Sequence, residues 1–195
     1  MSSTANKFDV EDYEFKDERE ELIDGEVVYK ALSGGKHSHI ENRVSTNVSH
    51  LFDRKKRKDG SGGWWILTEA SIQYRKVSEK GRQLTADVAG WKRERVPACP
   101  STFPIEELPD WVCEICHTTR KKDTTIVPET LAADGVEWYW LVDVEDELLT
   151  VFHLENGRFY VLKTWSKEDG KVRIPPFETA EFSIPILFGE DAEDE

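Results

Sequence analysis

A short apolar segment, residues 111–117, carries a single carboxylate at its centre. Its sequence, Trp-Val-Cys-Glu-Ile-Cys-His, is rich in residue types that favour a buried strand. A charge inside such a strand is unfavourable unless it is paired or bound to a metal ion. Because strand side chains alternate between faces, Glu114 is predicted to share a face with Val112 and Cys116. The segment therefore predicts that a sheet, and not a mobile loop, positions Glu114 as a working residue.

The size and composition of the chain fit one soluble domain. A length of 195 residues allows a single domain with a real core, and 38% hydrophobic with 33% charged residues is typical of globular proteins. No apolar run approaches the roughly 20 residues that span a bilayer, and the polar start does not resemble a signal peptide. We therefore expect a cytoplasmic protein with no membrane partner. Three cysteines, an odd number, favour reduced thiols.

The charge pattern bears on nucleic-acid binding in two opposite ways. A formal net charge of −13 disfavours nonspecific binding, which depends on neutralising phosphates with Lys and Arg. Basic clusters at 54–58, 92–95 and 120–122 nevertheless allow a locally basic groove. Any one such cluster, taken alone, is more often a solvated surface.

Local patterns predict one α+β domain over 18–189, between a loose acidic segment, 1–17, and an acidic tail, 190–195. Apolar runs bounded by turn residues predict the strands of a mixed, mostly antiparallel sheet. These are a hairpin over 21–29 with an Asp24-Gly25 turn, and segments 64–74, 83–91, 111–117, 138–142, 148–154 and 159–165.

Helices are expected to flank this sheet. Apolar residues at helical spacing up to Phe52 predict the first helix, with Ser38 and Glu41 as a capping box at its start. Pro128 near the beginning and Gly135 at the end predict a short second helix. The final apolar run, 184–188, is expected to pack on the sheet.

Two carboxylates, Asp87 and Glu114, lie inside apolar strands that follow one another along the chain. Brought together, their oxygens would make a site for a hard divalent cation, and Mg²⁺ commonly uses only one or two protein carboxylates. Such an ion activates water and stabilises charge that develops on phosphate. Two other interpretations stay open, namely buried acids paired with Arg or Lys and strand-end acids that face solvent.

These residues form a pattern that resembles the PD-(D/E)XK nuclease superfamily, and more closely its Uma-two family of restriction-endonuclease-like proteins. The resemblance implies a three-layered restriction-endonuclease-like core, with Asp87 and Glu114 as catalytic ligands of Mg²⁺ or Mn²⁺. It also implies hydrolysis of DNA phosphodiesters. The segments that carry it, in chain order, are Glu21–Glu26, His37 with the helix that follows, Ala86–Arg95, Pro109–Ile115 and Gly135–Asp143.

The chain departs from the pattern where catalysis needs a cation. Ala86 stands where the superfamily has Pro, and Cys116 stands where it has the Lys that orients water or stabilises phosphate charge. The closer family usually has a Lys in the following helix, and this chain has Val127 there. Lys122 is the candidate replacement and Lys121 a candidate substrate contact, although either could face solvent.

Three hypotheses follow. The first is a metal-dependent endonuclease with an incomplete active site, in which His37 contacts the substrate. The second is a catalytically degenerate nuclease fold that acts as a binding protein. The third, a zinc or redox protein using Cys113, Cys116 and His117, is weak because a strand points the two sulfurs to opposite faces. DNA and a second copy of the chain, as a homodimer, are the candidate partners; the sequence specificity is not predicted.

Overall fold

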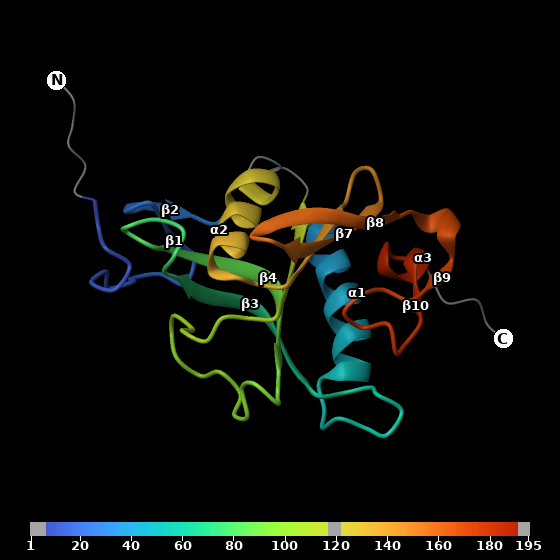
Figure 1. Ribbon diagram of the computed structural model, residues 1–195. Coiled ribbons are helices and arrows are strands. Elements are labelled where there is room, and N and C mark those ends of the chain that lie inside the picture. Colours follow the sequence, from blue (N-terminus) through green and yellow to red (C-terminus); the bar gives the residue numbers. More distant parts are fainter. Residues whose placement is uncertain (1–6, 117–121, 191–195) are drawn as a thin grey trace.

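The computed structural model describes residues 7–116 and 122–190. A mixed eight-stranded sheet runs in the order β2-β1-β4-β5-β6-β7-β8, and β3 pairs with β4 (Figure 1). The predicted α+β class with a mostly antiparallel sheet is confirmed. The strands are β1 (Glu20–Ile23), β2 (Glu26–Tyr29), β3 (Trp64–Tyr74), β4 (Arg82–Lys92), β5 (Trp111–Cys116), β6 (Trp138–Asp143), β7 (Leu148–Glu155) and β8 (Arg158–Trp165).

Strand β4 is the central element of the sheet, because three strands pair with it. β3 occupies one edge over almost its whole length. The other edge is shared by β1, which pairs at Arg82 and Gln83, and by β5, which pairs from Val88 to Gly90. Among the described strands, none pairs with residues 84–87 along that shared edge. This break in the sheet lies at the middle of a buried strand.

Strands β5 and β6 are parallel, so a crossover connection must join them, and such connections are usually helical. This connection contains a π-helical turn, η1 (Lys122–Ile126), and helix α2 (Val127–Asp134). Pro128 lies in the first turn, and Gly135 ends the helix in the left-handed region at φ 86°. The predicted second helix is therefore confirmed.

Helices cover both faces of the sheet (Figure 1). Helix α1 (Gly35–Phe52) packs its apolar side into one core, and Val127 and Leu131 of α2 pack into the other. The C-terminal part of the chain joins the α1 core through Ile184 and Leu187, as expected for the final apolar run. Its elements are η2 (Lys167–Asp169), β9 (Lys171–Val172), β10 (Phe182–Ser183) and α3 (Ile184–Leu187).

The predicted capping box at the start of α1 is wrong. The helix begins at Gly35, after Gly34 as N-cap, and no side chain caps it. Glu41 is therefore in the second turn, four residues after His37, and the two side chains share a helix face. The sequence pattern missed the first turn because the first buried apolar side chain of the helix is Ile40.

The described part of the N-terminal segment, residues 7–17, is attached to the domain. The backbone N–H of Phe8 donates to the carbonyl of Gly25, and that of Val10 donates to Lys80, both at 2.9 Å. The side chain of Val10 is buried. The described part of this segment therefore packs on the domain, and the prediction that it is loose is wrong for these residues.

Phe177 is the centre of an aromatic cluster between α1 and the sheet. Its ring centroid lies 4.7 Å from Phe52, 5.0 Å from Trp64, 4.9 Å from Trp111 and 5.6 Å from Trp140. The side chain is completely buried. Because rings from helix, sheet and C-terminal segment meet at this residue, it ties three parts of the chain together.

We predict that Phe177→Ala lowers the free energy of unfolding by about 3–5 kcal/mol, because it leaves a cavity among packed rings. Chemical denaturation measures this change. The matched control is Tyr160→Ala, since Tyr160 is 53% exposed and its loss should change stability by less than about 0.5 kcal/mol. Equal effects of the two substitutions would contradict this description of the core.

Candidate active site

A pocket of about 150 Å³ opens at the break along β4. Four of the residues predicted for the site line it, namely Asp87, Glu114, His37 and Lys122. The fifth, Lys121, lies outside the described residues. Other lining residues include Glu21, Val28, Tyr29, Lys30, Leu32 and Asp123.

The two predicted metal ligands lie where the pairing of β4 with β5 ends. Val88 and Cys113 are the last pair of this register, and Asp87 and Glu114 are the next residues of the two strands. The backbone N–H of Ile115 donates to Asp87 Oδ2 at 2.7 Å. Both carboxylates are buried, and both line the same pocket. Two neighbouring strands therefore hold this pair of carboxylates.

Asp87 is held by three donors. Besides the N–H of Ile115, Lys30 Nζ lies 2.7 Å from Oδ1, and His37 Nε2 lies 3.3 Å from Oδ2. Burial by itself raises the pKa of this carboxyl, but the His37 hydrogen bond and the Lys30 charge outweigh it and lower the pKa to about 2. Asp87 is therefore ionised at neutral pH despite its burial.

Lys30 is the main site residue that sequence analysis missed. It follows the last residue of β2, and its ammonium group bridges Asp87 and Glu69 Oε2, the latter at 2.8 Å. Burial acts to lower the pKa of this amine, but the charges of Asp87, Glu114 and Glu69 raise it, so Lys30 is cationic. A single Lys after an edge strand carries no pattern that separates it from a surface residue.

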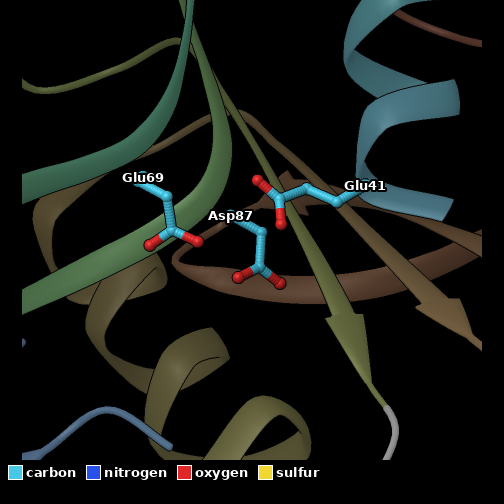
Figure 2. A group of neighbouring side chains, drawn as sticks. All are labelled: Glu41, Glu69 and Asp87. Atoms are coloured by element: carbon cyan, nitrogen blue, oxygen red, sulfur yellow. The ribbon is translucent and has the colours of Figure 1, made fainter. Parts of the chain in front are cut away.

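Three carboxylates from different elements lie close together (Figure 2). One oxygen each from Glu41 on α1, Glu69 on β3 and Asp87 on β4 lie within 4.8 Å of one another. The register of β3 with β4 sets Glu69 level with Asp87, but the backbone of Glu69 is left-handed, at φ 48°. Sequence analysis assigned no role to Glu69 and only a role in the capping box to Glu41.

Burial and the negative charge of this cluster raise the pKa of two neighbouring carboxyl groups, Glu41 and Glu114. Burial, and then the charges of Asp87 and Glu69, raise the pKa of Glu41 to about 7. Burial and the charge of Asp87 also raise the pKa of Glu114 well above its usual range. In the described part of the chain, no hydrogen bond or ion pair holds the Glu114 carboxylate, although it is 4% exposed and lines the pocket. The charges of Lys122 and Lys30 oppose this rise but do not offset it, so the buried Glu114 carboxylate lacks a compensating partner among the described residues.

This donor set fits a hard divalent cation. All candidate ligands are carboxylate oxygens, which suit Mg²⁺ and Mn²⁺, and no soft donor lines the pocket among the described residues. Asp87 belongs both to the opposed pair with Glu114 and to the cluster with Glu41 and Glu69. A cation bound at Asp87 would relieve the repulsion that raises the pKa of Glu41 and Glu114.

The second ammonium group of the site comes from Lys122. Its Nζ lies 2.7 Å from Oε1 of the buried Glu21, and the same oxygen accepts the N–H of Thr85 at 2.9 Å. Glu21 thus satisfies the backbone of β4 at the break and also positions Lys122. The two positions where the family pattern expects Lys, Cys116 and Val127, are buried and uncharged. Lys30 and Lys122 bring positive charge to the pocket instead.

The cysteines have other surroundings. Cys113 packs in the α1 core, where burial raises the pKa of its thiol, and Cys116 is buried at the end of β5. Cys99 is exposed, and His117 lies outside the described residues. Thiol chemistry therefore has no support from the placement of Cys113.

Comparison with known proteins agrees with this fold. Residues 8–186 match the family model described as "Uma2: Putative restriction endonuclease", and the chain belongs to this family. A solved structure described as a putative nuclease belonging to DUF820, from Anabaena variabilis, is 20% identical. It covers 87% of this chain and 89% of its own, with a TM-score of 0.68. None of the curated proteins compared with the chain matches it. The predicted family is confirmed, and family and fold support a nuclease-like function.

Within the described residues, none of the helices has the length and apolar character that crossing a membrane requires. The homodimer stays a prediction.

The raised pKa of Glu41 makes stability depend on pH in a defined direction. The unfolded chain loses the Glu41 proton near pH 4.5, but the folded chain keeps it to about pH 7. The folded state therefore binds more protons in this window, and stability falls as the pH rises through it. Glu41→Gln removes this effect. After allowance for solvent screening of a half-buried group, we expect it to be about 1–2 kcal/mol more stable than wild type at pH 8.

Thermal melts at pH 5 and pH 8 measure this difference, which should be small at pH 5. Glu178→Gln is the matched control, because Glu178 is exposed and makes no side-chain ion pair among the described residues. A stability difference between Glu41→Gln and wild type that does not change with pH would contradict the prediction.

Proposed function

We propose that this chain is a divalent-metal-dependent nuclease that hydrolyses DNA phosphodiesters at the Asp87 pocket. The observation that carries the proposal is the buried Glu114 carboxylate, which lines the same pocket as Asp87 and has no hydrogen-bond or ion-pair partner among the described residues. Membership in a family described as restriction endonucleases supports the choice of reaction. Both carboxylates line the pocket, so a phosphate group bound in it would lie next to them.

Asp87 and Glu114 are the proposed ligands of Mg²⁺ or Mn²⁺, with Glu41 and Glu69 as further oxygen donors. When bound, the ion would supply Lewis acidity toward a phosphate oxygen and lower the pKa of a water molecule. The carboxylates orient that ion, and their burial keeps the electrostatic interaction strong. In this scheme Glu41 gives up its proton when the cation binds.

Lys30 and Lys122 take the part of the missing motif Lys. Each has its ammonium group at the pocket, anchored by a carboxylate at 2.7 Å, Lys30 on Asp87 and Lys122 on Glu21. An ammonium group held in this way stabilises negative charge on the phosphate or orients the attacking water. His37 donates to Asp87 and keeps its carboxylate in place.

A second function, a catalytically degenerate binding protein, is favoured by a different observation. Both oxygens of Asp87 already have protein partners, Lys30 on one side and His37 with the Ile115 N–H on the other. In this account the ion pair replaces the metal, and the fold serves only to bind. Cation binding distinguishes the two accounts.

We predict that titration calorimetry detects Mn²⁺ binding to the wild-type protein, and that Asp87→Asn and Glu114→Gln each weaken it at least about tenfold because each removes a ligand charge. The same substitutions should abolish Mn²⁺-dependent nicking of supercoiled plasmid DNA. Glu178→Gln is the matched control and should retain both properties. Absence of Mn²⁺ binding by wild type would favour the degenerate protein, and nicking that survives both substitutions would sink the proposal.

The role of Lys30 has a separate test. Lys30→Met should lower the rate of nicking by about 100-fold through loss of charge stabilisation, and Lys30→Arg should restore part of it. Mn²⁺ affinity should not fall, because a competing cation has been removed from Asp87. If Lys30→Met weakens Mn²⁺ binding and leaves the rate at saturating Mn²⁺ unchanged, then Lys30 is only a structural partner of Asp87.

A further inference from the structure

A groove between helix α1 and strand β3 leads away from the carboxylate cluster. It begins beside the cluster, because Ser45 lies one turn after Glu41 and Thr68 directly precedes Glu69. The hollow measures about 520 Å³. Its walls are mostly hydroxyl and imidazole side chains, from Ser45, Thr46, Ser49, His50 and Thr68, with Ile66 beneath. Asp53 is its acidic residue, and Arg93 neutralises this carboxylate at 2.7 Å.

A basic pocket of about 400 Å³ lies at the far end of α1. Four cations line it, Lys55, Lys56, Lys92 and Arg93, together with Trp64 and one acid, Glu94. Arg93 is bound to Asp53, and Lys92 lies 3.0 Å from Glu137. Lys55 and Lys56 are exposed, and neither forms an ion pair within the described residues. Their charges are therefore available to an anionic ligand.

The loop that presents these two Lys residues is folded tightly on itself. Gly63 N–H donates to the carbonyl of Arg54 at 2.7 Å, and Arg57 N–H donates to that of Ser61 at 2.7 Å. A Cβ atom on Gly62, at φ 78°, would come within 2.5 Å of the Lys55 carbonyl oxygen, so only glycine fits. The backbone of the loop thus fixes the place of the cations and reduces the entropy lost when a ligand binds.

The separation of the two sites fits a nucleic-acid strand. Asp87 and Lys92 are five residues apart on β4, which spans about 17 Å at 3.3 Å per residue. From Glu41 to Phe52, helix α1 spans about the same distance, roughly 17 Å. A strand of duplex DNA advances about 3.4 Å per phosphate, so this span corresponds to about five phosphates.

We infer that the α1–β3 groove and the basic pocket bind the sugar–phosphate backbone of a nucleic acid, about five nucleotides from the carboxylate cluster. The choice of ligand rests on the proposed function. Hydroxyl side chains contact sugar and phosphate oxygens, and Lys55 and Lys56 neutralise phosphates. In a chain of net charge −13, this pocket offsets a general repulsion of DNA, so its two free Lys residues carry much of the binding.

The test is fluorescence anisotropy with a short labelled DNA, single-stranded and duplex, in EDTA so that no cleavage occurs. The variant is Lys55→Glu/Lys56→Glu. Its matched control, Arg158→Glu/Lys163→Glu, changes the net charge equally at exposed residues of β8. Wild type should bind, and the groove variant should bind at least about tenfold more weakly, with a salt slope smaller by about 2. The control should stay within about threefold of wild type.

Three outcomes would overturn the inference: no DNA binding by wild type, equal losses in the two double variants, or equally tight binding of polyglutamate through the same Lys residues. Melting curves of both variants check that they fold. Failure of the nuclease proposal is seen separately, since binding in EDTA that depends on Lys55 and Lys56, combined with no Mn²⁺-dependent nicking, would leave a nucleic-acid-binding protein without catalysis.

Discussion

The buried charge of Asp87 is the interaction on which the rest of the site depends. An ionised carboxylate inside a sheet requires compensation, and here the compensation comes from the hairpin that carries Lys30, the helix that carries His37 and the strand that carries Ile115. The hairpin and the helix follow one another along the chain, but Lys30 precedes Asp87 by 57 residues, and Ile115 follows it by 28. Their convergence on one carboxylate explains why the sheet is broken at this point of β4: a fully paired edge would leave no room for the side chains that reach it.

The division of one strand edge between two partners produces the pocket. β1 and β5 both pair with β4 but leave residues 84–87 between them, and the Glu21 side chain accepts the backbone N–H of Thr85 there. The same Glu21 holds Lys122. One side chain, Glu21, therefore both compensates for the break in the sheet and positions the Lys122 ammonium group.

Much of the fold could be predicted because local rules governed it. The Asp24-Gly25 pair has the positive φ values that a hairpin turn of this kind requires, and the strand and helix patterns follow burial. The placement of Asp87 and Glu114 in one pocket was expected from two acids in apolar strands that follow one another along the chain. Both predictions rested on residues whose neighbours along the chain constrain them.

The rest of the site depends on tertiary contacts that no local pattern records. Lys30 sits at the end of a short edge strand, and Glu41 looked like a capping residue because the first turn of α1 lacks an apolar signal. Glu69 is an exposed acid in a strand, which is ordinary in sequence. Only the packing of α1 and the β2 end against β4 makes these three residues neighbours of Asp87.

Glu69 occupies a left-handed backbone conformation that a residue with a side chain adopts only at an energetic penalty, about 1 kcal/mol or more. Glycine at this position would adopt the same backbone conformation without this penalty, but it has no carboxylate to pair with Lys30. Stability and site chemistry thus favour different residues at position 69. Selection for thermostability alone, without selection for the function of the pocket, would favour replacement of Glu69 by glycine.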